Sequence, residues 1–252
     1  PVGATTAGVG PAEAWPETLP GPLATKPLLA GIAQKSPAAA FEIAMRYAEG
    51  RGVPADLAAA APWFQRAADL GLAPAQFRLG SLYEKGQGVK KDLAEARRWY
   101  QAAADRGNAN AMHNIAVLYA EGIDGRPDFA MAAQWFTRAA RHGVADSQYN
   151  LAILYARGIG IEQNLAEAYK WFAVAAQRGD KDAAKKRDDL AQRMDQQTLT
   201  AARLAAQSFV PLTPPEDAVT VPPPPGGWED ATAGQGRPKP KGRIPMEQAA
   251  RL

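Results

Sequence analysis

Small and apolar positions recur along the middle of the chain with a constant spacing. Tryptophan marks the pattern most clearly, because the same residue returns every 36 positions at Trp63, Trp99, Trp135 and Trp171. Between these residues the apolar positions are three and four residues apart, as on one face of an α-helix. A fixed period of this length indicates a solenoid, in which each unit buries its apolar face against its neighbours.

Each block of the pattern predicts two helices joined by a turn. In the second block we expect a first helix from about Pro74 to Lys85, which Gly86 ends because glycine adopts the left-handed conformation without penalty. The second helix is expected from about Leu93 to Arg106, after Asp92 as its N-cap. Equivalent positions in the other blocks hold Gly50, Gly122 and Gly158 as helix ends and Asp56, Asp128 and Asn164 as N-caps.

The periodic part of the chain therefore predicts an all-α, right-handed α-solenoid of four helix-turn-helix repeats over residues 28–208. The third block moves the second glycine of its turn by one place, to Gly125, so an altered loop is expected between unchanged helices. Both ends of the solenoid are expected to carry polar caps. At the C-terminal end, two helices over 180–208 are expected to form this cap. The repeats span about 36–71, 72–107, 108–143 and 144–179. Besides the tryptophans, a second set of structural residues recurs at the same spacing: Tyr47, Tyr83, Tyr119 and Tyr155.

The two ends of the chain are rich in proline. Residues 1–27 are interpreted as a Pro/Gly-rich linker and residues 209–252 as a basic tail, both largely disordered because they bury too little apolar surface to offset the entropy of ordering. A weaker alternative is that the tail around Val219–Trp228 folds back into the groove of the solenoid. The basic residues of the tail cluster at Arg237, Lys239, Lys241 and Arg243.

Composition narrows the chemistry that the chain can support. Its 252 residues carry a formal net charge of +3 and contain no cysteine, which excludes disulfides and thiolate chemistry. The two histidines, His113 and His142, form no recognisable catalytic motif, and no phosphate-binding loop is present. We therefore expect a non-enzymatic protein with no cofactor, no metal and no nucleic-acid partner.

The beginning of the sequence indicates that the chain is a fragment or a processed product. It starts at Pro1, and its first methionine is Met45, inside the first block. No run of 18 apolar residues is present, so we expect no membrane span within these residues.

A family resemblance follows from the repeated motif. Blocks that read A-x-F-x-L-G-x-x-Y-x-x-G-x-G-V-x-x-D-x-x-x-A-x-x-W-Y/F-x-x-A-A-x-x-G resemble Sel-one-like repeats, which are relatives of the tetratricopeptide repeat. The stretches Ala111–Gly122 with Pro127-Asp128, Asp146–Gly158 and Gly179–Asp189 are similar to the repeat region of PodJ-type polar localisation factors of alphaproteobacteria. In that family the repeats lie in the periplasm, after a cytoplasmic coiled-coil part and one membrane span. The resemblance implies a periplasmic module whose parent is anchored in the inner membrane; the alternative is a cytoplasmic location.

The related tetratricopeptide geometry suggests where a partner would bind. There the first helices line a concave face, and in this chain an aromatic residue or histidine occupies one first-helix column in every block. These rings either contact a partner or pack onto the preceding second helix as core. The candidate residues, together called the first-helix surface, are Phe41, Glu42, Phe77, Arg78, His113, Asn114, Tyr149, Asn150 and Ile153.

The function predicted from these patterns is a protein–protein interaction scaffold that binds a peptide or partner protein in its groove. With the resemblance, it would be the periplasmic part of a factor that organises the cell pole or cell envelope. Two alternatives stay open: a peptidoglycan- or glycan-binding module, and a free periplasmic regulator of a signalling protein.

Overall fold

The computed structural model describes residues 15–123 and 125–230. Within these ranges the regular structure is entirely helical. The elements in chain order are η1 (Gly21–Leu23), α1 (Lys26–Ala33), α2 (Pro37–Glu49), α3 (Leu57–Asp69), α4 (Ala73–Lys85), α5 (Leu93–Asp105), α6 (Ala109–Glu121), α7 (Phe129–Arg141), α8 (Ala145–Arg157), α9 (Leu165–Ala176), α10 (Lys181–Ala191), α11 (Gln196–Gln207) and η2 (Glu216–Ala218).

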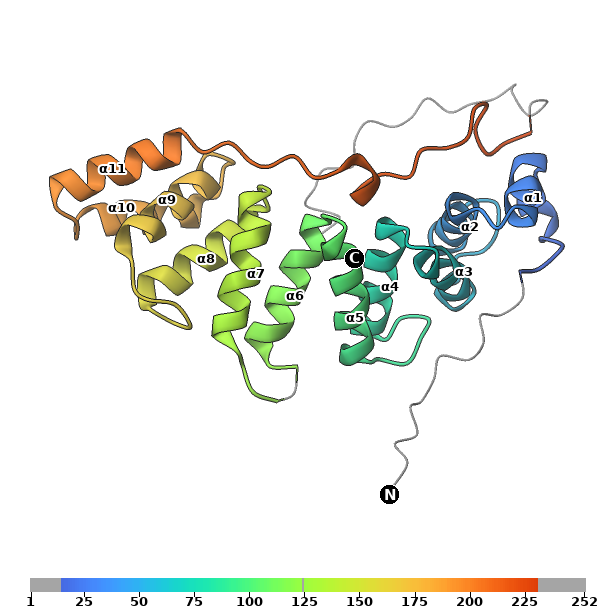
Figure 1. Cartoon of the computed structure of the whole chain (residues 1–252), viewed down its shortest axis with the longest axis horizontal. Coiled ribbons are helices and arrows are strands. Elements are labelled where there is room, and N and C mark those ends of the chain that lie inside the picture. The colour runs from blue at the N-terminus through green and yellow to red at the C-terminus, as the bar shows by residue number, and fades with distance from the viewer. Residues whose placement is uncertain (1–14, 124, 231–252) are drawn as a thin grey trace, which may run out of the picture.

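Helices α2 to α9 form four antiparallel pairs that follow one another in a row (Figure 1). Each first helix (α2, α4, α6, α8) packs most extensively against the second helix of its own repeat (α3, α5, α7, α9). Each second helix then packs against the first helix of the next repeat. The prediction of an all-α solenoid of four two-helix repeats is confirmed.

The turn inside each repeat is closed by one recurring backbone hydrogen bond. In the second repeat the amide of the N-cap residue Asp92 donates to the carbonyl of Tyr83 at 2.9 Å. Gly86 ends α4 in the left-handed conformation with φ 66°, and the Asp92 carboxylate accepts from the amides of Ala94 and Glu95. The altered loop of the third repeat keeps this bond. The equivalent pairs are Asp56–Tyr47 at 2.8 Å, Asp128–Tyr119 at 2.8 Å and Asn164–Tyr155 at 3.0 Å.

The tryptophan column forms the interior of the solenoid. The four indoles are only 3–7% exposed, and they lie among buried alanines of the same and neighbouring helices. A cation lies over each ring, where it is attracted by the negative face of the indole. The pairs are Arg66 with Trp63 at 5.0 Å, Arg98 with Trp99 at 4.1 Å, Arg138 with Trp135 at 4.4 Å and Lys170 with Trp171 at 4.7 Å.

The two ends of the row are covered by additional helices. Helices α10 and α11 both pack on α9 and bury Ala183, Leu190 and Leu199. At the other end α1 packs on α2. The N-terminal linker predicted for residues 1–27 therefore needs a correction for its described part, because Leu23 is fully buried and the ring of Trp15 packs on that of Trp63 at 6.1 Å. These apolar side chains find a buried surface on the first repeat.

Over residues 209–230, which we call the strap, the C-terminal tail departs from the prediction of disorder and, as in the weaker alternative, folds back on the solenoid. Instead of being disordered, the strap runs back along the solenoid from α11 to α1 (Figure 1). Phe209 packs on Trp171 with ring centroids 5.2 Å apart, and the Leu212 amide donates to the Arg141 carbonyl at 2.8 Å. Farther along, Ala218 is fully buried. Prolines favour this extended path because they remove backbone donors that would otherwise need partners. The basic cluster at 237–243 lies outside the described residues.

Candidate functional site

The first-helix surface is distributed over all four repeats. Its nine residues lie on α2, α4, α6 and α8, and successive repeats place them in corresponding positions. Arg78 is exposed, and the other eight residues are half-buried. Most side chains of this surface therefore have one part packed on the core and another part that faces solvent.

The four predicted rings of this surface each pack against a second ring. Phe77 lies 5.8 Å from Tyr100, measured between ring centroids, and both residues belong to the second repeat. The rings therefore pack on the core, as the core alternative expects, but the partner ring lies on the second helix of the same repeat and not on the preceding one. The other pairs are Phe41–Phe64 at 5.7 Å, His113–Phe136 at 5.7 Å and Tyr149–Phe172 at 5.5 Å.

The partner rings were missed by sequence reasoning although a signal was present. Each follows directly after a repeat tryptophan, and the column is aromatic in every block. All four are buried, with exposed fractions of 0–3%, so they fix the orientation of the half-exposed ring above them. The partner residues are Phe64, Tyr100, Phe136 and Phe172.

Polar groups of this surface are linked across helices. The hydroxyl of Tyr100 donates to Glu84 Oε2 at 2.5 Å. Burial, and then the charge of Glu84, raise the pKa of Tyr100 well above its usual range, while side-chain hydrogen bonds with Asn114 and Ser81 act in the opposite direction. Asn114 therefore contributes to a polar cluster that joins the second and third repeats.

His113 is a second polar link. Its Nδ1 lies 2.7 Å from the hydroxyl oxygen of Ser147, a fully buried residue of α8. Burial lowers the pKa of His113, and the nearby carboxylate of Asp146 opposes this shift in part. The neutral imidazole is the form that suits this position, between the third and fourth repeats.

The last repeat is linked to the C-terminal cap in a similar way. The hydroxyl of Tyr149 donates to the Asp182 carboxylate of α10. Burial, and then Asp182, raise the pKa of Tyr149 to about 12. Asn150 lies beside it and forms no side-chain hydrogen bond with any residue that the structure describes, so its amide is available to a ligand. Ile153 is half-buried one turn farther along α8.

Two charged candidates differ in their availability. Arg78 is exposed on α4, where it can meet an acidic or carbonyl group of a partner. Glu42 is already engaged, because its carboxylate accepts from Arg46 Nε at 2.8 Å and from Arg51 Nη1 at 2.9 Å. Glu42 therefore contributes less to recognition than its position in the sequence suggested.

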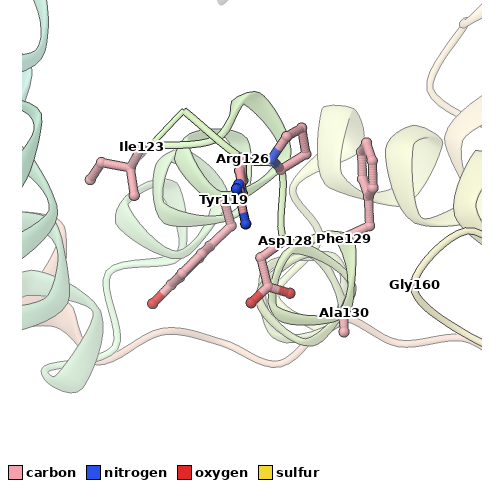
Figure 2. A pocket seen from close by; sticks show the side chains of 8 residues that line it. Tyr119, Ile123, Arg126, Asp128, Phe129, Ala130 and Gly160 are labelled. Carbon is pink, nitrogen blue, oxygen red and sulfur yellow. The ribbon is translucent and has the colours of Figure 1, made fainter.

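A hollow of about 590 Å³ lies on another part of the molecule, at the altered loop of the third repeat (Figure 2). It is partly apolar, and its polar groups are side chains of Tyr119, Arg126 and Asp128. The Asp128 carboxylate already accepts from the amide of Met131 as an N-cap, so it has a structural role. The remaining lining comes from Ile123, Pro127, Phe129, Ala130 and Gly160. Across residues 15–123 and 125–230 no group of three acidic or histidine side chains could hold a metal ion.

The repeats of this chain match a known protein family. The family model described as "Sel1 repeat" matches residues 37–72, 73–108, 109–144 and 145–180. The chain belongs to the Sel1 repeat family. Each of the four matched segments begins at the first residue of a first helix, so the Sel1 boundaries coincide with the observed helix pairs.

Two solved structures show the same arrangement. A Sel1 repeat protein from Oxalobacter formigenes is 31% identical with a TM-score of 0.61, over 73% of this chain and 78% of that one. The protein c5321, described as a protective antigen of uropathogenic Escherichia coli with an SLR fold, is 32% identical with a TM-score of 0.62. That match covers 71% of this chain and 40% of the longer antigen. No protein of curated function showed significant similarity to the chain.

Sel1 repeats are non-catalytic scaffolds that mediate protein–protein binding, and this chain carries four of them. In the part of the chain that the structure describes, no helix is both long and apolar enough to cross a membrane.

Proposed function

We propose that this chain is a scaffold whose first-helix surface binds a peptide or a partner protein. We further propose that it is the periplasmic part of a membrane-anchored polar localisation or cell-envelope organising factor. The repeat family supports the general role, and the resemblance to PodJ-type proteins supports the specific one.

One observation carries the proposed binding surface. The buried side of the ring column is the same in each repeat, because every ring packs on an aromatic residue of its own second helix at 5.5–5.8 Å. Its exposed side varies, from phenylalanine in two repeats to histidine and tyrosine in the others. The polar atoms of His113 and Tyr149 are bonded within the chain, to Ser147 and Asp182, so it is the exposed part of the column that differs between repeats. The variation therefore favours recognition of a partner that differs along its length.

The same packing favours a protein partner over a glycan. Sugar rings stack on open aromatic faces, whereas each ring here is half-buried against a second ring. The groups that remain available are the Asn150 amide and the exposed Arg78 guanidinium. These side chains can bind the backbone carbonyls and carboxylates of a peptide.

Site-specific photo-crosslinking in the parent protein tests the surface. A benzophenone side chain at Asn150 or Arg78 should give one discrete crosslinked partner, whereas the same group at the exposed Gln134 of α7 should not. Binding of the purified partner should then weaken with Asn150→Ala and stay unchanged with Gln134→Ala. Equal crosslinking at all three positions would contradict the proposal. Retention on purified peptidoglycan that is lost with Phe77→Ala and Tyr149→Ala would instead support the glycan alternative.

The proposed location has a separate test because the chain contains no cysteine. A parent protein with Gln134→Cys should react with a membrane-impermeant maleimide in intact spheroplasts, and the unmodified parent provides the control. Labelling only after lysis would place the repeats in the cytoplasm. Removing residues 26–208 from a fluorescent parent should also disperse its polar focus.

A further inference from the structure

Arg46 occupies a position that holds leucine in the other three repeats. Leu82, Leu118 and Leu154 fill the equivalent sites with exposed fractions of 2–7%, and Arg46 is equally buried at 4%. A buried guanidinium is costly unless it is paired and hydrogen-bonded. The buried guanidinium of Arg46 in the first repeat must therefore have partners that offset the cost of its burial.

One partner of Arg46 comes from the far end of the chain. Its Nη2 donates to Glu229 Oε1 of the strap at 2.7 Å, in addition to the bond from its Nε to Glu42 Oε1 at 2.8 Å. Glu229 itself is 66% exposed, so the strap carboxylate reaches the buried guanidinium from the surface. Such a charge-assisted pair is stronger than a neutral hydrogen bond.

The residues on both sides of Glu229 are also bound, and by different chemistry. The Thr25 hydroxyl donates to the Trp228 carbonyl at 2.7 Å. The amide of Lys26, the first residue of α1, donates to Asp230 Oδ1 at 2.8 Å. The start of a helix has unpaired amides and a partial positive charge, both of which favour a carboxylate.

The ring of Trp228 lies against small residues where α1 meets α2. A β-carbon built on Gly31 would lie 3.7 Å from the indole and only 2.4 Å from the β-carbon of Ala39. Glycine at this position thus allows the two helices to approach closely and leaves a surface for the indole. Trp228 packs there as a partly buried member of the first-repeat core.

These contacts form a separate unit within the strap. The strap is anchored again at Ala218, whose carbonyl accepts from Asn108 Nδ2 at 2.7 Å. Between the two anchors, Pro222, Pro223 and Pro225 are exposed. The anchor at residues 228–230 is therefore separated from the anchor at Ala218 by an exposed, proline-rich segment.

We propose that Thr25, Lys26, Gly31 and Arg46 form a binding site for peptides that carry an aromatic residue followed by two carboxylates. The chain's own Trp228-Glu229-Asp230 segment occupies this site in cis. A partner segment of the same chemistry would have to displace a tethered ligand, whose effective concentration is on the order of millimolar. The site lies apart from the rings of α4, α6 and α8 and shares only Glu42 with the first-helix surface, so it does not depend on the function proposed for that surface.

The experiment uses the full chain with an opened site. Trp228→Ala, Glu229→Gln and Asp230→Asn together remove the tethered ligand and leave the rest of the strap in place. A labelled peptide with the sequence of residues 221–230 is then titrated, and binding is followed by fluorescence anisotropy. The opened chain should bind the peptide, and the native chain should bind it at least about tenfold more weakly because of the competing tether.

Arg46→Leu in the opened chain is the matched variant, because leucine fills this position in the other repeats and preserves packing. It should weaken peptide binding by about tenfold or more, as expected for the loss of a charge-assisted hydrogen bond. A peptide with Trp228→Ala should also bind more weakly, and the Lys26 amide of the native chain should exchange with solvent more slowly than that of the opened chain. Equal binding by native and opened chains, no effect of Arg46→Leu, or no binding up to about millimolar peptide would each overturn the proposal.

Discussion

The Nδ1 atom of His113 lies 2.7 Å from the hydroxyl oxygen of Ser147, so one hydrogen bond joins the first helices of the third and fourth repeats. Burial lowers the pKa of this histidine in the folded chain. The unfolded chain therefore binds a proton at this residue more readily than the folded chain does.

This relationship predicts that acid weakens the interface between the third and fourth repeats. The contribution of neutral His113 is fully present above its unfolded pKa of about 6.5 and declines as the pH falls below that value towards the lower folded pKa. The first two repeats have phenylalanine at the position of His113. His113→Phe should therefore remove the pH dependence that this histidine contributes. Urea-unfolding midpoints between about pH 7.5 and 5.5 measure the effect, and His142→Gln is the control. A native chain as stable at the lower pH as at the higher would contradict the prediction.

The tryptophan column predicts a large loss of stability when one indole is removed. Trp135 is 6% exposed and is covered by Arg138. Trp135→Ala should lower the free energy of unfolding by about 3–5 kcal/mol, because it leaves a cavity among alanines that cannot move inward. The neighbouring Gln134→Ala is exposed and should change it by less than about 0.5 kcal/mol. Chemical denaturation of both variants tests the difference.

The N-cap of α5 offers a smaller and more selective test. The Asp92 carboxylate accepts from the amides of Ala94 and Glu95 at 2.9 and 3.0 Å. Asp92→Ala should destabilise the chain by about 1 kcal/mol, since two helix-end donors lose their partner. Asp92→Asn should have little effect, as Asn164 performs the same role in the fourth repeat. If thermal unfolding shows both variants to be equally destabilised, the cap is not the cause.

Replacing either of two loop glycines by alanine should lower the free energy of unfolding, but by different amounts. Gly88 has φ 71°, and an added β-carbon would lie 2.3 Å from the Leu57 carbonyl oxygen; Gly125 has φ 81° and open space. Gly125→Ala should therefore cost only the left-handed conformation, about 1–2 kcal/mol. Gly88→Ala adds a clash with backbone and should cost clearly more. Denaturation midpoints in the same buffer compare the two, and equal losses would show that the loop relaxes away from Leu57.

The strap predicts a local effect at Asn108. This side chain caps α6 through Oδ1, which accepts from the Ala111 amide at 2.9 Å, while its Nδ2 donates to Ala218. Asn108→Asp keeps the cap and removes the donor, so the strap should loosen around η2 while α6 stays intact. Hydrogen exchange should become faster at Val219 and Thr220 but not at Ile115. Unchanged exchange at both strap residues would show that other contacts hold this segment.

Much of the first-helix surface could be predicted because it follows from helical spacing. Helical spacing assigns residues such as Phe77 and Tyr149 to one column, and the structure places them in equivalent positions on α4 and α8. What spacing did not reveal is how each group is engaged. Tyr149 is paired with Asp182 of the cap, a contact that depends on how neighbouring helices are offset. Glu42 is paired locally, with Arg46 one turn along α2 and with Arg51 just after the helix.

The repeats, the helices and the helix ends all follow from the amino-acid sequence alone. These features arise from local causes: the spacing of apolar residues, the left-handed glycines such as Gly86 and the N-caps such as Asp92 act within a few residues of one another. The path of residues 209–230 depends instead on the folded repeats, as does the pairing of Arg46 with Glu229, which are 183 positions apart. Low hydrophobicity and frequent proline predict disorder when a segment is considered alone. Here the folded solenoid supplies the partners, since its helix ends and buried cation can bind the strap only after the repeats have stacked.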